Sequence, residues 1–236
     1  MNLNEKDRVL EMLKNNTLEL DDTFSFDCDR CGKCCRNRED ILLNAKDLYR
    51  LCRYLGLTAQ EFIGRYCEMY IGEASRIPVL RLLPRQYRQT CPLLGKDGCT
   101  DAVKPVVCAL FPLGRALKHS ENRIVYFTQG ETCGKGYVTH TLREWLDTFG
   151  LEYQDEDAIR WFQLTGDLAK TMHRVEAMLD KTLLAAIRMA MLHCFYLDYD
   201  YAQPFTPQFK RNEKLLRQFL CAYGVMEDEL QRKSAD

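Results

Sequence analysis

The chain has 236 residues and a formal net charge of −1, with 46% hydrophobic and 28% charged residues. This composition excludes an intrinsically disordered chain, and the balanced charge gives no reason to expect nucleic acid or a membrane surface as a partner. No apolar run approaches the ~18 residues of a membrane span, and the N-terminal stretch MNLNEKDRVLEMLKNN is charged where a secretion signal is apolar. We therefore expect a cytoplasmic protein.

The N-terminal part of the chain predicts a short helix, a turn and a capped helix. Residues 4–16 have amphipathic helical spacing, and the acidic segment Leu18–Asp27 predicts a turn that leads into a cysteine cluster. Asn44 is a typical N-cap and Gly56 a typical helix stop, and together they delimit a helix. The apolar face of this helix is predicted to comprise Leu48, Leu51, Cys52 and Leu55.

A second helix and two strands are expected next. Thr58 followed by Glu61 is a capping box that opens the helix. The inward-facing residues are predicted to be Phe62, Ile63, Tyr66 and Tyr70. Residues 78–83 and 123–128 are rich in branched or aromatic side chains and predict strands, whereas residues 91–112 combine proline and glycine and predict turns.

The C-terminal part of the chain predicts helices. A capping box at 141–144 opens a helix that ends at Gly150. A long helical pattern follows over 155–196, and Gly166 is expected to break it into two pieces. A last helix is predicted over 206–224.

Twelve cysteines are the unusual feature of the composition, and ten of them lie between Cys28 and Cys133. In a secreted protein such a number would suggest disulfides. Because the sequence predicts no export signal and the cytosol keeps thiols reduced, metal ligation or redox chemistry is favoured instead.

The strongest motif is Cys28-x2-Cys31-x2-Cys34-Cys35. Two-residue spacing lets a tight turn direct two sulfurs at one ion, as in zinc knuckles and iron–sulfur loops. The side chains of adjacent Cys34 and Cys35 are expected to diverge. One of them is therefore expected to serve a second ion, another corner of a cluster or a redox role.

Three later segments combine cysteine with glycine or proline, and their candidate ligands are Cys91, Cys99, Cys108 and Cys133. Glycine and proline fix a ligand loop and let backbone N–H groups approach the sulfur, which suits a thiolate centre. The eight candidate thiolates could form one four-ligand site with spare cysteines, or two separate sites.

The ordered combination of these motifs is similar to a known family. The segments Cys28-Asp-Arg-Cys31-Gly-Lys-Cys34-Cys35-Arg, Cys91-Pro-x6-Cys99 and Lys104-Pro-x2-Cys108-x2-Phe-Pro112 resemble the YkgJ-type CxxCxxCC cysteine-cluster family, over about residues 28–137. The resemblance implies a zinc- or iron-chelating domain, with Cys133-Gly-Lys-Gly as the similar closing segment and Lys104 where the family usually has arginine. A flagellin lysine N-methylase group carries a similar cluster, which the resemblance suggests is of the iron–sulfur kind. Because the chain shows no convincing glycine-rich S-adenosylmethionine loop, a methylase is not expected.

The other four cysteines lie on predicted helices and are interpreted as small core residues, namely Cys52, Cys67, Cys194 and Cys221. The histidines show no ligand spacing, and none is assigned to a metal; they are His119, His140, His173 and His193. We find no Ser/His/Asp pattern, P-loop or dinucleotide motif, so no catalytic residue is assigned.

Spacing alone does not decide between zinc and an iron–sulfur cluster, because both accept all-thiolate sites. Eight thiolates without a histidine, in loops that resemble ferredoxin-type ligand loops, favour a [4Fe–4S]-type cluster in electron transfer or in support of a modification reaction. The alternative is zinc in a non-catalytic structural module whose helical C-terminal region binds a partner protein. A third hypothesis is metal storage or delivery through exchangeable ligands.

The predicted fold is mainly α (α+β), with an irregular cysteine-rich metal-binding lobe that contains short strands and a helical C-terminal extension. We expect an N-terminal helix and lead-in over residues 1–27, the cysteine-cluster domain over 28–137, and a helical region over 138–236 that packs on it. Metal binding is expected to supply part of the folding free energy of the lobe, because its loops offer few periodic apolar faces.

Overall fold

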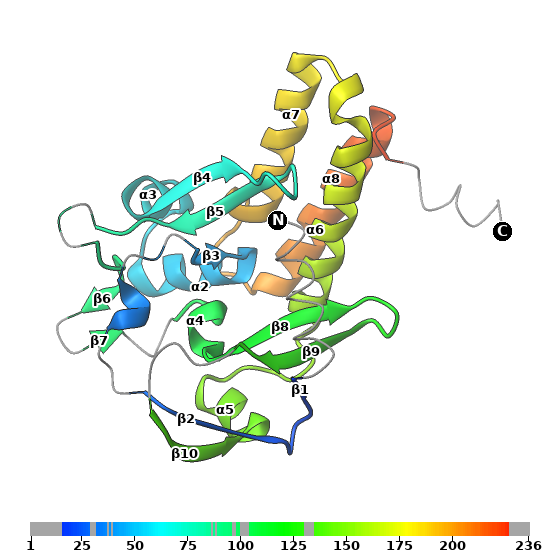
Figure 1. The fold of residues 1–236 in the computed structure, drawn as a ribbon. Coiled ribbons are helices and arrows are strands. Elements are labelled where there is room, and N and C mark those ends of the chain that lie inside the picture. The colour runs from blue at the N-terminus through cyan, green and yellow to red at the C-terminus, as the bar shows by residue number, and fades with distance from the viewer. Residues whose placement is uncertain are drawn as a thin grey trace. The chain divides into compact units, whose positions relative to one another are not determined.

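The computed structural model describes residues 16–28, 32–36, 38, 40–85, 87, 89–95, 98–99, 104–129 and 135–226. The helix expected at 4–16 therefore lies almost entirely outside the described residues. The fold is α+β, as the sequence predicts, and its short strands form small sheets (Figure 1). Within the described ranges, no helix combines the length and apolar character needed to cross a membrane.

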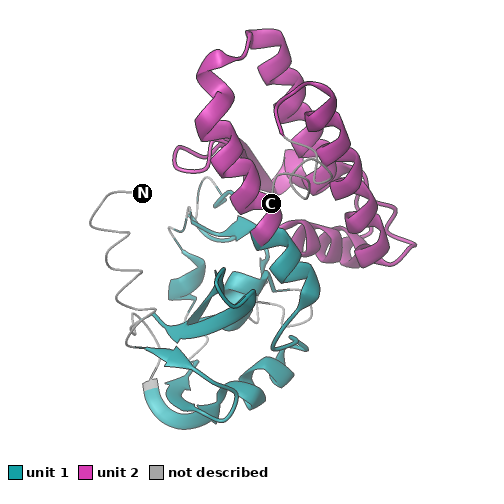
Figure 2. Cartoon of the chain, turned by 90° about the vertical axis from the view of Figure 1, so that its right-hand side faces the viewer, with its two compact units in different colours: residues 1–43, 81–162 teal, residues 44–80, 163–236 magenta. Residues whose placement is uncertain are grey.

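The chain forms two compact units, each assembled from two separate stretches of sequence (Figure 2). Unit 1 comprises residues 1–43 and 81–162, and unit 2 comprises residues 44–80 and 163–236. Residues 28–137, the expected cysteine-cluster domain, therefore contribute to both units.

Unit 1 contains short antiparallel strands and short helices. The strands are β1 Thr17–Leu18, β2 Thr23–Asp27, β3 Leu42–Leu43, β6 Leu94–Gly95, β7 Gly98–Cys99, β8 Leu113–Lys118, β9 Arg123–Thr128 and β10 Lys135–Thr141. The helices are the 3-10 helix η1 Lys33–Cys35, α4 Val106–Leu110 and α5 Leu142–Thr148. One sheet has the order β1-β9-β8, a second joins β10 to β2, and β6 pairs with β7 in a hairpin.

The core of unit 1 forms where β2 meets α5. Phe24 and Phe26 are buried on one face of β2, whereas the residue before each of them is exposed. Both rings contact Trp145 of α5 edge-to-face, at centroid distances of 5.5 and 5.8 Å. The turn predicted for Leu18–Asp27 is therefore wrong over residues 23–27, because alternating polar and aromatic side chains form a strand with one buried face.

Unit 2 is mainly helical. Its elements are α2 Ala45–Leu55, α3 Ala59–Tyr66, β4 Cys67–Ile71, the 3-10 helix η3 Glu176–Met178, α7 Lys181–Leu192, the π-helix η4 His193–Leu197 and α8 Phe205–Ala222. Two further elements, β5 Pro78–Leu82 and α6 Glu156–Val175, are each divided between the units. β5 lies beside β4 in its sheet.

The predicted caps of the first two helices are confirmed. The Asn44 side chain accepts a hydrogen bond from Asp47 N–H at 2.8 Å, and the Thr58 hydroxyl accepts one from Glu61 N–H at 3.2 Å. Gly56 ends α2 in the left-handed region, with a φ of 65°. These local signals are strong because each satisfies backbone groups that the helix itself leaves without a partner.

Other predicted elements are also confirmed. The strands expected at 78–83 and 123–128 correspond to β5 and β9, and the capping box at 141–144 opens α5. The helix expected over 206–224 is α8. The segment 91–112 contains turns, as predicted, and in addition the β6–β7 hairpin and α4.

Two boundaries in unit 2 differ from the prediction. α3 ends at Tyr66, so Tyr70 lies on β4 with 37% of its surface exposed instead of on an inward helix face. α6 runs through Gly166 without a break, and α7 begins after Asp180, whose carboxylate accepts hydrogen bonds from two backbone N–H groups of its first turn. A capping residue fixes this boundary, whereas a glycine inside a helix costs only about 1 kcal/mol.

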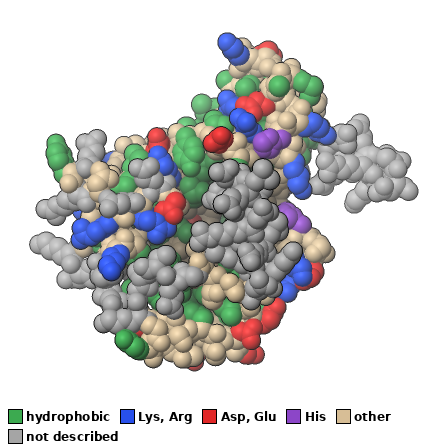
Figure 3. Space-filling model, in the orientation of Figure 1, with side chains coloured by type: hydrophobic (Ala, Val, Ile, Leu, Met, Phe, Trp, Pro, Cys, Tyr) green, Lys and Arg blue, Asp and Glu red, His purple; other side chains and the backbone are tan. Residues whose placement is uncertain are grey.

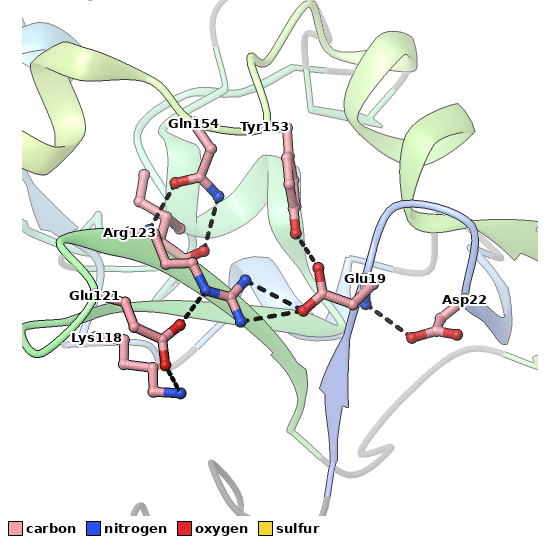
Figure 4. Close-up of polar contacts among 8 residues, drawn as sticks. Glu19, Asp22, Lys118, Glu121, Arg123, Tyr153 and Gln154 are labelled. Atoms are coloured by element: carbon pink, nitrogen blue, oxygen red, sulfur yellow. Dashed lines mark hydrogen bonds and ion pairs between the residues drawn. The ribbon is translucent and has the colours of Figure 1, made fainter.

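A polar network attaches the N-terminal stretch of unit 1 to β9 (Figure 4). The Arg123 guanidinium donates to Glu19 at 3.2 Å and to Glu121 at 2.6 Å. The Tyr153 hydroxyl donates to Glu19 at 2.5 Å, and this hydrogen bond lowers the pKa of Glu19. Burial and the neighbouring carboxylate raise the pKa of Tyr153 to about 12. Gln154 adds two hydrogen bonds to the backbone of β9.

Close packing between β8 and β9 gives a first prediction. Gly114 pairs with Phe127 in the sheet, and a Cβ at Gly114 would lie 2.6 Å from the nearly buried Phe127 ring. Because this ring has little room to move, Gly114→Ala should lower the free energy of unfolding by about 2 kcal/mol. Urea denaturation followed by circular dichroism measures the change.

Gly64→Ala is the matched control. Gly64 lies on the exposed face of α3, where a Cβ would meet nothing within 4 Å apart from its chain neighbours and the adjacent backbone of its own helix. Alanine in this helical position should raise the free energy of unfolding by about 1 kcal/mol. An unchanged stability of Gly114→Ala would contradict the close packing of β8 against β9.

Candidate metal centre

The candidate ligands that the structure describes all belong to unit 1. Backbone positions are described for six of the eight, Cys28, Cys34, Cys35, Cys91, Cys99 and Cys108. Cys31 and Cys133 lie outside the described residues, and so does the side chain of Cys99. No disulfide joins any two of the cysteines whose side chains are described.

The four cysteines interpreted as core residues all belong to unit 2. Cys52 and Cys194 are 0% and 3% exposed, which confirms the interpretation for these two. Burial raises the pKa of the Cys52 thiol to about 11. Cys67 and Cys221 are half-buried, and Cys67 lies on β4 instead of on the expected helix.

The Cys34–Cys35 pair lies in η1. Gly32 precedes it with a φ of 70°, and this left-handed turn, which favours glycine, allows Cys35 N–H to donate to Gly32 O at 3.1 Å. The two sulfur atoms are 3.8 Å apart, and both side chains are half-buried. The expected divergence of these side chains is therefore wrong, because in the tight turn of η1 they lean toward each other.

Cys91 is attached directly to this pair. Its backbone N–H donates to Cys35 O at 2.7 Å, and an antiparallel bridge joins the residue after Cys35 to the residue before Cys91. Cys91 O in turn accepts a hydrogen bond from Leu94 N–H at 3.1 Å. Leu94 pairs with Cys99 in the β6–β7 hairpin, so the backbone of Cys99 lies beside the same turn.

Cys108 is carried by α4, which the core of unit 1 holds in place. Trp145 Nε1–H donates to Leu110 O at 3.2 Å, and the Phe111 ring contacts Phe26 edge-to-face at 5.6 Å. Leu110 is itself part of the buried core cluster. These contacts hold in place the helix that carries the half-buried Cys108 side chain.

Cys28 directly follows β2, and its side chain is exposed. Asp27, the last residue of β2, pairs with Lys135 at the start of β10. In the sequence, Cys133 is two positions before Lys135. The pairing of β2 with β10 therefore places the beginning of the CxxCxxCC motif beside the start of β10.

An ion pair that the residue pattern did not reveal lies close to the cysteines. Arg38 donates to both carboxylate oxygens of Asp40, at 2.5 and 2.7 Å. This hydrogen bonding raises the pKa of Arg38, and the sulfurs of Cys108 and Cys34 raise it further. The guanidinium therefore lies within electrostatic reach of both cysteines. Its sequence signal, an Arg-x-Asp spacing, is too common to identify it in advance.

The pKa values of the Cys34 and Cys91 thiols are both raised, so their thiolate forms are disfavoured. The hydrogen bond with Cys35 raises the pKa of Cys34, and burial raises it further. Burial also raises the pKa of Cys91, although two backbone N–H groups of the following turn act on its sulfur in the opposite direction. Because neighbouring thiolates repel each other, ionising both Cys34 and Cys35 is unfavourable in the absence of a nearby cation.

Basic side chains surround the cysteine segments. In the space-filling view, lysine and arginine gather over η1 and the β6–β7 hairpin (Figure 3). The exposed cations of these segments include Lys33, Arg36 and Arg85. Arg85 also donates to Pro92 O at 2.7 Å, directly after Cys91. Positive charge of this kind favours thiolates, and the Arg85 charge acts to lower the pKa of Cys91, but burial outweighs it and the pKa of Cys91 is raised.

The donor set fits a thiophilic metal ion. Tetrahedral zinc forms bonds of about 2.3 Å to sulfur, so two thiolates on one ion lie about 3.8 Å apart, as the sulfurs of Cys34 and Cys35 do. Among the side chains that the structure describes, no group of three or more Cys, His, Asp or Glu is arranged to hold an ion. The described side chains therefore provide one pair of neighbouring sulfurs, those of Cys34 and Cys35. Cys91 is joined to this pair through its backbone.

No family model, curated protein or solved structure matches the chain. The similarity to the cysteine-cluster family therefore stays a prediction from residue spacing. Lys104, which stands where that family usually has arginine, lies 5.0 Å from the centre of the Phe149 ring in a cation–π contact.

Burial and thiol pKa predict an order of reactivity in metal-depleted protein. Cys28 is exposed, whereas Cys34 and Cys91 are half-buried with raised pKa values. Since the thiolate is the nucleophile, iodoacetamide at neutral pH should modify Cys34 and Cys91 at least about tenfold more slowly than Cys28. Peptide mass spectrometry over time measures the three rates.

The pH dependence follows from the sign of the same shifts. A raised pKa keeps the thiol protonated, so alkylation of Cys34 should still accelerate as the pH rises above about 9. Urea-unfolded protein is the control, in which Cys28 and Cys34 should react at similar rates. Equal rates in the folded protein would contradict the described burial.

Proposed function

We propose that the chain is a metal-binding protein whose unit 1 carries a thiolate-ligated metal centre. The supporting observation is the close pair of sulfurs of Cys34 and Cys35, together with the backbone hydrogen bond that joins this pair to the separate segment of Cys91. Arg38 lies within electrostatic reach of Cys34 and of Cys108, which α4 carries. A cationic side chain beside paired thiols suits an anionic metal centre better than it suits an apolar core.

The proposed ligands are the eight cysteines of the motif and of the later segments, Cys28, Cys31, Cys34, Cys35, Cys91, Cys99, Cys108 and Cys133. Cys133 lies outside the described residues, and its position in the sequence motif supports including it. Lys135 pairs with Asp27, next to Cys28. Whether the eight form one site or two is decided by the metal content per chain.

An iron–sulfur centre of the [4Fe–4S] type is the first candidate, because eight cysteines without a histidine suit iron and sulfide. Such a protein would pass electrons, or support a modification reaction, in the cytoplasm. Zinc is the second candidate, and the 3.8 Å between the sulfurs of Cys34 and Cys35 favours it because this distance fits one tetrahedral ion. With zinc, the centre is structural and the helical C-terminal region binds a partner protein.

Anaerobic purification distinguishes these candidates. Iron and sulfide of about four each per chain, with broad absorption near ~400 nm, support the cluster. Zinc without sulfide or colour supports the structural centre. A chain that retains neither metal contradicts the proposed function.

Removal of single thiols tests the ligand assignment. Cys34→Ser and Cys91→Ser should each lose most of the bound metal, because each variant removes a soft thiolate ligand from a site that requires several. Inductively coupled plasma mass spectrometry gives the metal content per chain.

Cys221→Ser is the matched control, since Cys221 is half-buried on α8 in unit 2. This variant should keep the wild-type metal content. Full retention of metal by Cys34→Ser would show that the pair in η1 is not part of the centre.

A further inference from the structure

The position of the Cys34–Cys35 pair is fixed by its backbone. Within η1, Cys35 N–H donates to Gly32 O at 3.1 Å, and Cys35 O accepts from Cys91 N–H at 2.7 Å. The backbone is therefore held on both sides of Cys35, and side-chain rotation is the main freedom that the sulfurs retain. In the described arrangement the two sulfurs are 3.8 Å apart.

Two arrangements of adjacent thiolates require different separations. Two thiolates on one tetrahedral metal atom, with bonds of about 2.3 Å, lie about 3.8 Å apart. On a four-iron cluster each thiolate extends outward from a different iron, which places neighbouring sulfurs about 6 Å apart. The separation of the Cys34 and Cys35 sulfurs matches the first arrangement and is about 2 Å too short for the second.

We propose that Cys34 and Cys35 bind the same metal atom, either a single tetrahedral thiophilic ion or one iron of a two-iron cluster. This inference rests on the proposed metal-binding function and specifies which ligands share an atom. It differs from the expectation from the sequence, in which one of the two adjacent cysteines serves a second ion, another corner of a cluster or a redox role. In this arrangement the pair does not occupy two corners of a [4Fe–4S] cluster.

The surroundings of the pair suit two thiolates on one cation. Cys91 is bonded through its backbone to Cys35, and Arg38 lies within reach of Cys34 and of Cys108. Four thiolates on a divalent cation carry two excess negative charges, and the neighbouring arginines offset part of this charge.

The test uses the full chain with its metal replaced by cadmium-113, a thiophilic ion that accepts tetrahedral thiolate sites. A proton–cadmium correlation spectrum shows which cysteine β-protons couple to which cadmium atom. We expect the β-protons of Cys34 and Cys35 to correlate with one and the same cadmium resonance. Correlations with two different resonances, or a correlation from only one of the two residues, would overturn the inference.

Single substitutions check the assignment of the signals. Cys34→Ser and Cys35→Ser should each remove their own correlations and shift the same cadmium resonance, because oxygen replaces sulfur on that atom. Cys221→Ser should leave every cadmium resonance in place. If a serine variant loses its cadmium, sequential backbone assignment of the wild-type chain still identifies the β-protons, so the test remains decisive.

Failure of the proposed function gives a different result. A chain that takes up neither cadmium, zinc nor iron overturns the metal centre and this inference together, whereas cadmium uptake with Cys34 and Cys35 on separate atoms overturns this inference alone. In protein with its native metal, zinc without sulfide identifies the single-ion form, and about two iron and two sulfide per chain identify the two-iron form. A [4Fe–4S] cluster that requires both Cys34 and Cys35 as ligands would overturn the inference that they share one metal atom.

Discussion

Repulsion between neighbouring thiolates is the constraint on which the proposed centre depends. The hydrogen bond from Cys91 N–H to Cys35 O joins two segments that are distant in the sequence. At this point the sulfurs of Cys34 and Cys35 lie 3.8 Å apart. Thiols this close cannot both ionise without a cation between them. A bound metal ion would remove that cost, and the charge of Arg38 would offset part of the negative charge that remains. The proposed ion would also link loops that have little apolar surface of their own.

The apolar core of unit 1 stabilises the elements that carry the candidate cysteines. Edge-to-face contacts of Phe24 and Phe26 with Trp145 build a core, and that core holds α4 through the hydrogen bond from Trp145 to Leu110 O. The ligand loops therefore extend from a scaffold that apolar packing stabilises. Unit 2 has its own buried residues, and its cysteines Cys52 and Cys194 are part of them. Stability of unit 2 is accordingly expected to be independent of metal.

Local sequence signals predicted most of the helices correctly. The placement of side chains around the cysteines could not be predicted from the sequence. The capping boxes at Asn44 and Thr58 act within a few residues, so they were readable from spacing alone. The break expected at Gly166 was wrong because the cap at Asp180 is stronger than the preference of one glycine against helix. The approach of the Cys34 and Cys35 sulfurs, and the ion pair of Arg38 with Asp40, depend on side-chain rotamers. Residue spacing carries no information about such rotamers.

Hydrogen exchange with and without metal tests most directly whether a metal centre organises unit 1. Metal depletion should increase exchange in the cysteine segment of unit 1 around residues 90–95, because we expect its backbone order to depend on the ion. Exchange in α4, which the apolar core holds, and in α7 and α8 of unit 2 should stay unchanged. Identical exchange of residues 90–95 in both preparations would contradict an organising role for the metal. Equal loss of protection in both units would show that the dependence is global and does not belong to unit 1.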